Sequence, residues 1–439
     1  MNKNLSLSFI LSMAVVCATA TERSYQEQCR IAQAILAPQH TATAQNRVAP
    51  SQMQALTMLQ RNDQLTVLGY QRGGFVILSN DDANKAVLGY STTSRFAEEN
   101  APLQWFLETA SRSLATHRIS AQSASIPTDC KASVDHLVTS KWNQGAPFWD
   151  KCPTDRSGTH CWTGCVATAM AQIMRYYQYP SYGIGKDTAY FEKQPYVVNF
   201  ANTAYDWDNM IDSYDGSYSV NEKFAVATLM YHCGVAAHMT YGVGASGAYL
   251  TDAAEGMANH FGYITKYYGY KDYPTADNYN DAQWREVVYH ELSDGHPILY
   301  AGTSNANGDD NACSHCFVFD GYDSEGNIGV NWGYGGLGDG FFDFDALICA
   351  AYTPSENFEW YHEMVVIHHP DAGPIHYSLE AADIHKAQSS DANEPVQVYD
   401  LSGRLIYTAT SSVFSLRDVP TQGMVIIKQG DTARKVVVK

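Results

Sequence analysis

The sequence contains few basic residues. Its 439 residues include 28 lysines and arginines against 46 acidic residues, which gives a formal net charge of −18 at pH 7. No basic cluster is present to neutralise phosphates, which argues against nucleic acid or an anionic lipid surface as a partner. After the first 20 residues the sequence also lacks any run close to the roughly 20 apolar residues that span a bilayer. The length allows two or three domains with buried cores.

Residues 1–20 have the organisation of an export signal. Lys3 provides the positive start, residues 5–16 the short apolar stretch, and residues 18–20 the small side chains of a cleavage site. Cys17 is a poor lipid acceptor, because valines precede it where small residues are expected. We therefore predict a signal peptide over 1–20, and a protein that is secreted or held at the cell surface after export through the periplasm.

A segment over 21–130 precedes the rest of the mature chain. It begins with helical spacing over 26–36, and a second helix is predicted over 102–117. Between the helices lie three strand-like runs separated by turn residues, at 65–70, 73–79 and 86–90. Small polar residues over 120–128 then predict an exposed linker that is open to cleavage. The pattern predicts a small α+β domain.

A single cysteine stands at the start of a predicted helix further along the chain. Gly164 forms a turn before Cys165, and the small and apolar residues over 166–177 have the spacing of a buried helix that ends before Pro180. The free amides and the positive dipole end of a helix stabilise a thiolate in its first turn. Cys165 is therefore a candidate nucleophile. The alternative is a small buried hydrophobic residue, the usual state of a free cysteine.

A nucleophilic thiol needs a base, and His315 is the best placed of the 15 histidines. It precedes an apolar run that predicts a buried strand, and a turn over 323–327 leads to a second strand that ends at Asn331 and Trp332. This hairpin returns Asn331 and Trp332 towards His315. The Asn331 amide is expected to accept a hydrogen bond from one ring nitrogen, and the indole to shield that bond from water. The alternatives are a structural histidine and an ordinary turn.

Gln144 lies upstream in a short segment over 141–148. Its side-chain amide is a candidate donor to the oxyanion that forms on a substrate carbonyl, with the backbone amide of Cys165 as the second donor. One such donor contributes roughly 3 kcal/mol to lowering the barrier. The alternative is a solvated loop residue.

These residues fall in three motifs, in the order Gln, Cys, His, Asn-Trp along the chain. The motifs are Trp-Asn-Gln-Gly-Ala-Pro at 142–147, Thr-Gly-Cys-Val-Ala-Thr-Ala-Met-Ala-Gln-Ile-Met at 163–174 and Asn-Trp-Gly-Tyr-Gly-Gly at 331–336. Together they resemble the streptopain family of papain-fold cysteine peptidases, over roughly residues 131–368. The resemblance implies that Cys165 is the nucleophile, His315 the general acid and base, and Gln144 a residue of the oxyanion hole. It also implies that Asn331 and Trp332 orient and cover the base.

Two departures from the family pattern concern the surroundings of the base. Ser314-His315-Cys316 stands where the family usually has Gly-His-Ala, and Tyr334 stands where it usually has a second tryptophan. The first departure alters the wall that faces a substrate and places a second thiol beside the base. The second removes some aromatic cover, and neither removes a group that the chemistry requires.

The resemblance extends to the segments on either side of these motifs. The segment over 21–130 is similar to the propeptide of streptopain-type zymogens, which implies an inhibitory prosegment; an ordinary accessory domain is the alternative. The glycine-rich loop over 241–249 allows close approach of a peptide backbone and is expected to border the cleft, although a flexible surface loop explains it too. The expected substrate-binding residues are Ser246, Gly247 and Ser314.

Nine cysteines remain once Cys17 is removed with the signal peptide. The odd count leaves at least one thiol unpaired, which agrees with a reactive Cys165. Cys152 and Cys161 are a candidate disulfide, and the other pairings cannot be deduced. A tetrahedral zinc site is a competing interpretation, with candidate ligands at His160, Cys161, Cys165, Cys313, His315 and Cys316.

The character of the chain changes again from residue 371. A hairpin with Ser-Gly at its turn is predicted over 396–407, and three more strand-like pieces follow at 413–416, 424–428 and 434–439. The unit resembles the C-terminal sorting domains of the type IX secretion system of Bacteroidota, although Gly423-Met424-Val425 stands where Gly-x-Tyr is common. The alternative is a carbohydrate-binding or packing module of immunoglobulin-like shape.

These predictions describe an α+β protein in three folded parts. A papain-like two-subdomain peptidase over 131–370 follows a propeptide over 21–130 and precedes a small β-sandwich-like domain over 371–439. The expected function is that of a secreted cysteine endopeptidase, made as a zymogen, that cleaves proteins through an acyl-enzyme on Cys165 with no metal or cofactor. Its expected partners are protein and peptide substrates, its own propeptide and the secretion machinery. The alternatives are a zinc-binding protein and a catalytically inert papain-shaped binding protein.

Overall fold

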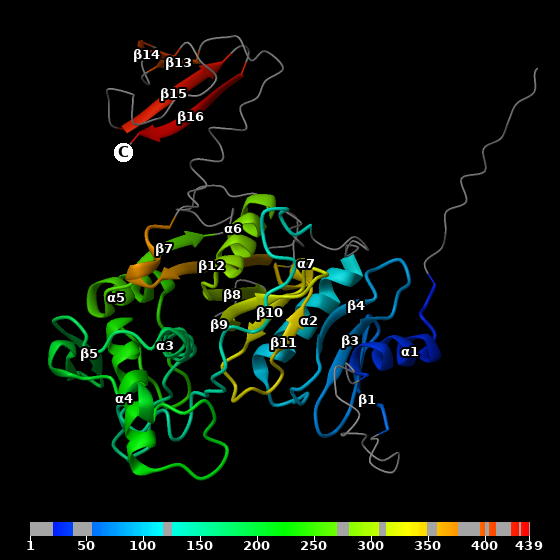
Figure 1. Ribbon diagram of the computed structural model, residues 1–439, viewed down its shortest axis with the longest axis horizontal. Helices are drawn as coiled ribbons and strands as arrows, with labels where there is room; N and C mark the ends of the chain where they lie inside the picture. Colours follow the sequence, from blue (N-terminus) through cyan, green and yellow to red (C-terminus); the bar gives the residue numbers. More distant parts are fainter. Residues whose placement is uncertain are drawn as a thin grey trace, which may run out of the picture.

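A ten-stranded antiparallel sheet runs through the protein (Figure 1). The strand order is β1-β2-β3-β4-β11-β10-β9-β8-β12-β7. The computed structural model describes residues 21–37, 55–116, 125–269, 281–306, 313–348, 358–375, 396–399, 404–409, 423–429 and 432–438. Below, "N-terminal segment" means residues 21–116 and "central region" means residues 125–375.

The N-terminal segment supplies the first four strands of the sheet and two helices. The strands are β1 (Thr57–Arg61), β2 (Leu65–Gly69), β3 (Phe75–Ser79) and β4 (Val87–Ser91). β2 and β3 are buried on both faces, because α1 (Tyr25–Leu36) packs on one face and α2 (Ala101–Thr116) on the other. The three predicted strands are present. β1 is an additional strand at the sheet edge, where no side chain is buried, so its sequence carries no apolar run.

The central region supplies the other six strands. They are β7 (Ile264–Gly269), β8 (Ile298–Ala306), β9 (Cys313–Tyr322), β10 (Ile328–Asn331), β11 (Gly340–Phe342) and β12 (Phe358–His368). β11 pairs with β4, with Phe341 opposite Tyr90 and Phe342 opposite Gly89. The N-terminal segment and the central region therefore share one hydrogen-bonded sheet.

Helices cover both faces of the central strands. α3 (Cys165–Tyr177), α4 (Val220–Ala236) and α5 (Leu250–Phe261) form a core with one face, while α6 (Asp281–Asp294), α7 (Phe344–Ile348) and α2 pack on the other. Side chains alternate along β9 accordingly. Cys316 and Val318 face the α3 side, whereas Phe317 and Phe319 face the α2 and α6 side.

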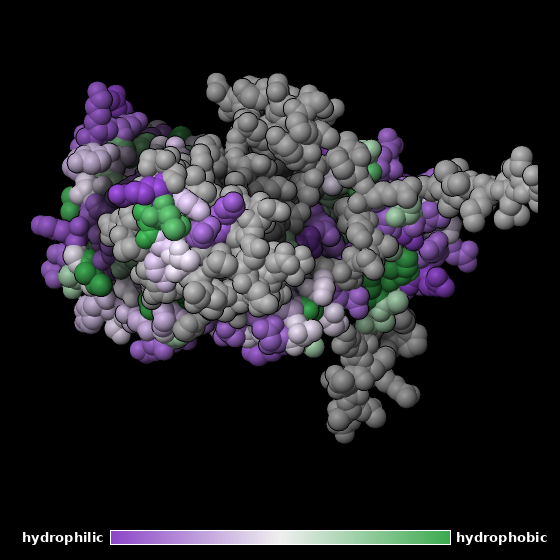
Figure 2. Space-filling view, turned by 90° about the horizontal axis from the view of Figure 1, so that it is seen from above, coloured by the Kyte–Doolittle hydropathy of each residue, from purple (hydrophilic) through white to green (hydrophobic). Residues whose placement is uncertain are grey.

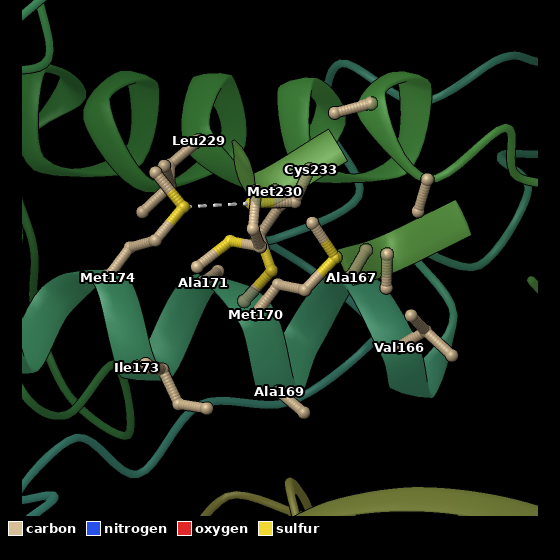
Figure 3. Close-up of a cluster of buried hydrophobic side chains, with 14 of the residues drawn as sticks. Val166, Ala167, Ala169, Met170, Ala171, Ile173, Met174, Leu229, Met230 and Cys233 are labelled. Carbon is tan, nitrogen blue, oxygen red and sulfur yellow. Dashed lines mark hydrogen bonds between the residues drawn. The ribbon is translucent and has the colours of Figure 1, made fainter. Parts of the chain in front are cut away.

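Helix α3 is the buried centre of its layer. Residues 166–174 are all buried, and Met170 and Met174 pack against side chains of α4 (Figure 3). The Cys233 thiol of α4 lies 3.6 Å from the Met174 sulfur. Each fully buried methionine contributes roughly 1.5–3 kcal/mol through the hydrophobic effect. The helix predicted over 166–177 is thus confirmed.

Two smaller sheets complete the described structure. β5 (Lys186–Phe191) pairs with β6 (Gln194–Asn199). A four-stranded C-terminal sheet has the order β14-β13-β15-β16, from β13 (Val396–Tyr399), β14 (Leu405–Ala409), β15 (Gly423–Gln429) and β16 (Thr432–Val438). The strand predicted at 413–416 lies outside the described residues, and the strands that are described here form a single sheet.

The face of the molecule shown in Figure 2 is mostly hydrophilic where the structure describes it. Hydrophobic residues form only small separate spots on this part of the face. None of the described helices has the length and apolar character that crossing a membrane requires.

Candidate active site

Cys165 is the first residue of α3, as predicted. Gly164 before it has φ 85° and ψ 145°, a conformation that other residues rarely adopt. A Cβ atom on Gly164 would lie 2.8 Å from the Met239 sulfur and 3.0 Å from the Ser246 carbonyl. Glycine is therefore required here by both the backbone and the packing. The Cys165 side chain is partly exposed, and its position allows the free amides of the first helical turn to stabilise a negative charge.

The segment that contains Gln144 lies against the turn before Cys165. The Gln144 carbonyl accepts hydrogen bonds from the Thr163 backbone amide and hydroxyl, each at 3.3 Å. The Gln144 side chain is partly exposed, and its amide makes no hydrogen bond with another described residue. A free donor thus lies close to the start of α3.

Gln172 connects this segment to the turn that contains Asn331. It lies seven residues after Cys165, on the same side of α3, and is fully buried. Its side-chain oxygen accepts from the Ser140 hydroxyl at 3.2 Å and the Trp142 amide at 3.3 Å, and its amide donates to the Asn331 side-chain oxygen at 3.0 Å. The predicted site residues do not include Gln172. A polar amide inside a run of small and apolar helical residues is the signal that identifies it.

His315 lies on β9 and is bonded to the end of the neighbouring strand. Its Nε2 lies 2.9 Å from the Trp332 carbonyl, and because a carbonyl only accepts, Nε2 carries the hydrogen. His315 is buried, with 8% of the residue exposed. Burial lowers the pKa of His315 to about 4, against the opposing effect of the Trp332 carbonyl. The imidazole is therefore neutral in this conformation.

The imidazole projects from the face of β9 that α2 covers. His315 is opposite Gly302 on β8, and a Cβ atom on Gly302 would lie 2.7 Å from the Trp105 indole of α2. The ring also stacks on Phe317, with centroids 6.0 Å apart. Cys165, in contrast, packs on the α3 side of the sheet. The hydrogen bond of His315 goes to Trp332 and not to the Cys165 thiol.

Cys316, the second thiol beside the base, projects towards α3. Burial raises the pKa of Cys316 well above its usual range, and the nearby Cys165 adds to this effect. Cys316 therefore stays protonated and does not compete as a nucleophile.

The predicted hydrogen bond between Asn331 and His315 is wrong for this conformation. The Asn331 side-chain oxygen accepts from Gln172 and from the Gly333 amide, each at 3.0 Å, and the Asn331 amide donates to the Ser140 carbonyl at 2.9 Å. The predicted hairpin itself is present, with β9 paired to β10. Asn331 is opposite Val318, which faces α3, so its side chain extends away from the imidazole.

Trp332 is fully buried between the hairpin and the N-terminal segment. Its ring centroid lies 4.8 Å from that of Phe317 and 6.4 Å from that of Phe106 on α2. Its backbone amide donates to an Asp339 carboxylate oxygen at 2.9 Å. Burial raises the pKa of Asp339 to about 7, although the Trp332 amide acts in the opposite direction. The carbonyl that binds His315 is thus fixed by Asp339 and by the N-terminal segment together.

The N-terminal segment also binds the loop that follows Trp332. The Ser94 hydroxyl donates to the Gly336 carbonyl at 2.9 Å, and the Asn100 amide to the Leu337 carbonyl at 2.6 Å. The Lys85 ammonium lies 2.6 Å from the Asp343 carboxylate, with both side chains nearly buried. These contacts restrain the whole turn after β10.

The glycine-rich loop over 241–249 lies beside the start of α3. The Ser246 carbonyl approaches Gly164, and the Ser246 hydroxyl accepts from the Gly242 amide at 3.0 Å. Gly247 exchanges backbone hydrogen bonds with Thr240 and has open space where a side chain would stand. Ser314 is opposite Thr303 in the sheet, but its side chain lies outside the described residues.

The predicted alternatives based on the other cysteines are not formed. Cys152 and Cys161 are free thiols, not a disulfide. The His160, Cys161, Cys165, His315 and Cys316 side chains do not form one of the potential metal-binding groups found in the described residues, and the Cys313 side chain lies outside these residues. The His160 ring instead stacks on Trp149, and His315 is occupied by Trp332.

Comparisons with known proteins agree with this geometry. A profile of the Peptidase C10 family matches residues 142–342, and one of the Spi protease inhibitor matches residues 22–114. Streptopain of Streptococcus pyogenes is 32% identical over 304 residues, which cover 64% of this chain and 74% of that protein. The thiol protease/hemagglutinin PrtT of Porphyromonas gingivalis is 27% identical over 297 residues, which cover 63% of this chain and 33% of that protein.

A solved structure extends the likeness to three dimensions. The structure of prointerpain A from Prevotella intermedia matches with a TM-score of 0.61 and 35% identity, covering 71% of this chain and 98% of that one. The resemblance inferred from the three motifs is confirmed by these matches, and so is the α+β, papain-like fold with an N-terminal prodomain. The chain belongs to the Peptidase C10 family, the streptopain family of cysteine peptidases, and carries the inhibitor domain of a zymogen at its N-terminal end.

Proposed function

We propose that Cys165 is the nucleophile of this cysteine endopeptidase and that His315 is its general acid and base. His315 takes the thiol proton, and the sulfur attacks the carbonyl carbon of the scissile bond. The tetrahedral intermediate then collapses, the imidazolium returns the proton to the leaving amine, and water activated by the same imidazole releases the acid product. The main support is the position of Cys165 at the start of a buried helix, behind a glycine that no other residue can replace.

Gln144 is proposed to complete the oxyanion hole with the backbone amide of Cys165. Its free side-chain amide lies near the start of α3, where it can donate to the developing charge. Asn331 and Trp332 are proposed as positioning residues, since one is bonded to α3 through Gln172 and the other is bonded to His315. Ser246, Gly247 and Ser314 are proposed to contact the substrate on either side of the thiol.

The conformation described above is proposed to be the latent state. His315 is bonded to the Trp332 carbonyl, and α2 covers that face of the sheet through Trp105 and Phe106. Activation then requires that the N-terminal segment leaves and that the imidazole turns towards Cys165. On this proposal the N-terminal segment inhibits by holding the base, without occupying the position of the nucleophile.

Replacement of each thiol and of the base tests these roles. Cys165→Ala and His315→Ala are expected to abolish hydrolysis of a protein substrate, whereas Cys316→Ala is expected to retain most of it, because that thiol stays protonated. Iodoacetamide near neutral pH should label the matured wild-type enzyme and its Cys316→Ala variant, but not Cys165→Ala. Hydrolysis by purified Cys165→Ala would disprove the assignment of the nucleophile.

We further propose the division of the chain and its export route. Residues 1–20 act as a signal peptide, 21–130 as the propeptide, 131–370 as the peptidase, and 371–439 as a sorting domain that secretion machinery of the type IX kind recognises. Support comes from the sequence pattern and from the separate C-terminal sheet. Deleting residues 371–439 should leave peptidase activity intact and retain the protein in the periplasm of its host. Unchanged secretion of the deletion variant would favour the alternative, a binding or packing module.

A further inference from the structure

A cluster of one carboxylate and two imidazole side chains lies where α6, β12 and the last residue of α3 meet. Glu291 is on the last turn of α6, His296 follows that helix, and His368 ends β12. One ligand atom from each residue lies within 4.8 Å of the other two. Glu291 is 2% exposed and His368 4% exposed. None of these residues belongs to the candidate active site, since about 18 Å of helix separates the first and last residues of α3.

The hydrogen bonds of His296 leave one ring nitrogen available. Its Nδ1 lies 3.0 Å from the Tyr177 hydroxyl, and that hydroxyl donates to the Ile367 carbonyl at 3.2 Å. Because the hydroxyl hydrogen is used in this way, the Tyr177 oxygen accepts from Nδ1–H of His296. With the hydrogen on Nδ1, the lone pair of the neutral ring is on Nε2.

His368 makes a hydrogen bond through each of its ring nitrogens. Its Nδ1 lies 3.3 Å from the Gly373 carbonyl, which only accepts, so this nitrogen carries a hydrogen. Its Nε2 lies 2.7 Å from a Glu291 carboxylate oxygen, so a proton lies between these two atoms, in the place that a metal ion would take. The two imidazole rings are stacked, with centroids 4.0 Å apart. Histidines that bind metals commonly donate the other ring N–H to an oxygen, which fixes the tautomer and aims the free nitrogen at the ion.

The second carboxylate oxygen of Glu291 has no partner. Glu291 Oε1 is buried, and it accepts no hydrogen bond within the part of the chain that the structure describes. An unsatisfied buried carboxylate oxygen is costly and therefore uncommon. A cation that the two imidazoles also contact would satisfy it.

We propose that Glu291, His296 and His368 form a zinc-binding site. Two imidazole nitrogens and a carboxylate are ligands that zinc prefers, with water in the fourth position, whereas calcium and magnesium require oxygen ligands. Ligands of a tetrahedral zinc lie about 2.0 Å from the ion, and hence about 3.3 Å from one another. Binding releases the proton between Glu291 and Nε2 of His368, and the 2.7 Å separation of these two atoms then widens by less than 1 Å. The ion would join the end of α6 to the end of β12.

The test uses the full chain with Cys165→Ala, which prevents self-processing and removes the proposed nucleophile. The protein is stripped with a chelator and titrated with Zn²⁺ in a calorimeter. We expect one Zn²⁺ per chain, a higher melting temperature in its presence, and at least a hundredfold weaker binding in Glu291→Gln and His368→Gln. His369→Gln is the matched control, because it makes the same change one residue further on and should bind Zn²⁺ normally.

Titration with Co²⁺ reports the ligand set without relying on the ligand variants. Visible ligand-field bands with no sulfur charge-transfer band are expected. A sulfur band that Cys130→Ser removes would assign the metal to the other group of potential ligands, Asp129, Cys130 and His290, and would overturn the proposal. Failure of the folded, stripped chain to bind Zn²⁺ would overturn it too, and would mean that the cluster is a buried Glu–His ion pair. Neither result would affect the proposed role of Cys165.

Discussion

Replacing Phe106 with alanine tests whether the N-terminal segment holds the base through Trp332. Phe106 is fully buried, and its ring centroid lies 6.4 Å from that of Trp332 and 5.0 Å from that of Phe342. Truncating a buried phenylalanine costs about 3–5 kcal/mol. Both aromatic partners of Phe106 belong to the central region. We therefore assign about half of this loss, roughly 2 kcal/mol, to the contact between the N-terminal segment and the central region. Such a loss raises about 30-fold the population of chains in which the N-terminal segment has separated from the central region.

The assay is the initial rate at which the full-length zymogen hydrolyses a fluorogenic peptide before any processing. Phe75→Ala is the matched control, because Phe75 is equally buried but its ring pairs with Phe96 inside the N-terminal segment, at 5.7 Å. We expect Phe106→Ala to raise the unprocessed rate about 30-fold and Phe75→Ala to raise it much less. Equal effects of the two variants would show that general destabilisation of the segment is responsible. No effect of Phe106→Ala would refute the role of the Trp332 contact.

Three further predictions concern the geometry of the site. Gln144→Ala should lower kcat of the matured enzyme about a hundredfold or more but leave thiol alkylation unchanged, because it removes only an oxyanion donor; slower alkylation would argue instead for a structural role. Gly164→Ala should lower the free energy of unfolding by more than about 1–3 kcal/mol, because the added methyl group meets both backbone strain and close neighbours. Gly158 has the same φ of 85° but open space around it, so Gly158→Ala should cost only the backbone strain. Urea unfolding of the two variants measures the difference. Burial raises the pKa of Asp339 from its ordinary 3.8 to about 7, so the folded chain binds this proton more tightly than the unfolded chain, and stability falls as pH rises from about 4 to about 7. Asp339→Asn should remove that part of the decline in unfolding experiments between about pH 4 and pH 7. Parallel profiles for the two proteins would contradict the assignment.

The features that depend on neighbouring residues could be predicted from the sequence. Gly164 followed by small and apolar residues fixes the start of α3, because no other residue tolerates that turn and the helix must pack closely on both sides. The hairpin of β9 and β10 followed from two apolar runs around a turn. Both patterns are local, so the positions of Cys165 and His315 in the secondary structure were predictable.

The partners of the polar side chains could not be predicted in the same way. Asn331 bonds to Gln172 because strand alternation turns it towards α3, and the sequence does not show which face of β10 meets that helix. His315 bonds to a backbone carbonyl, a partner that every residue offers. The pairing of β4 with β11 was also missed, because it joins two short strands that are far apart in the chain.

The pairing of β4 with β11 determines what must happen after the link between the N-terminal segment and the central region is cut. Cleavage within residues 117–130 breaks the covalent link but leaves the shared sheet, the nearly buried Lys85–Asp343 ion pair and the aromatic contact with Trp332 in place. Release of the segment has to break all of these contacts together and exposes the buried aromatic side chains to water. The cut N-terminal segment is therefore expected to remain bound, with His315 still attached to the Trp332 carbonyl. Activity should follow the later loss or digestion of that segment, so activation has two steps, and the second one frees the base.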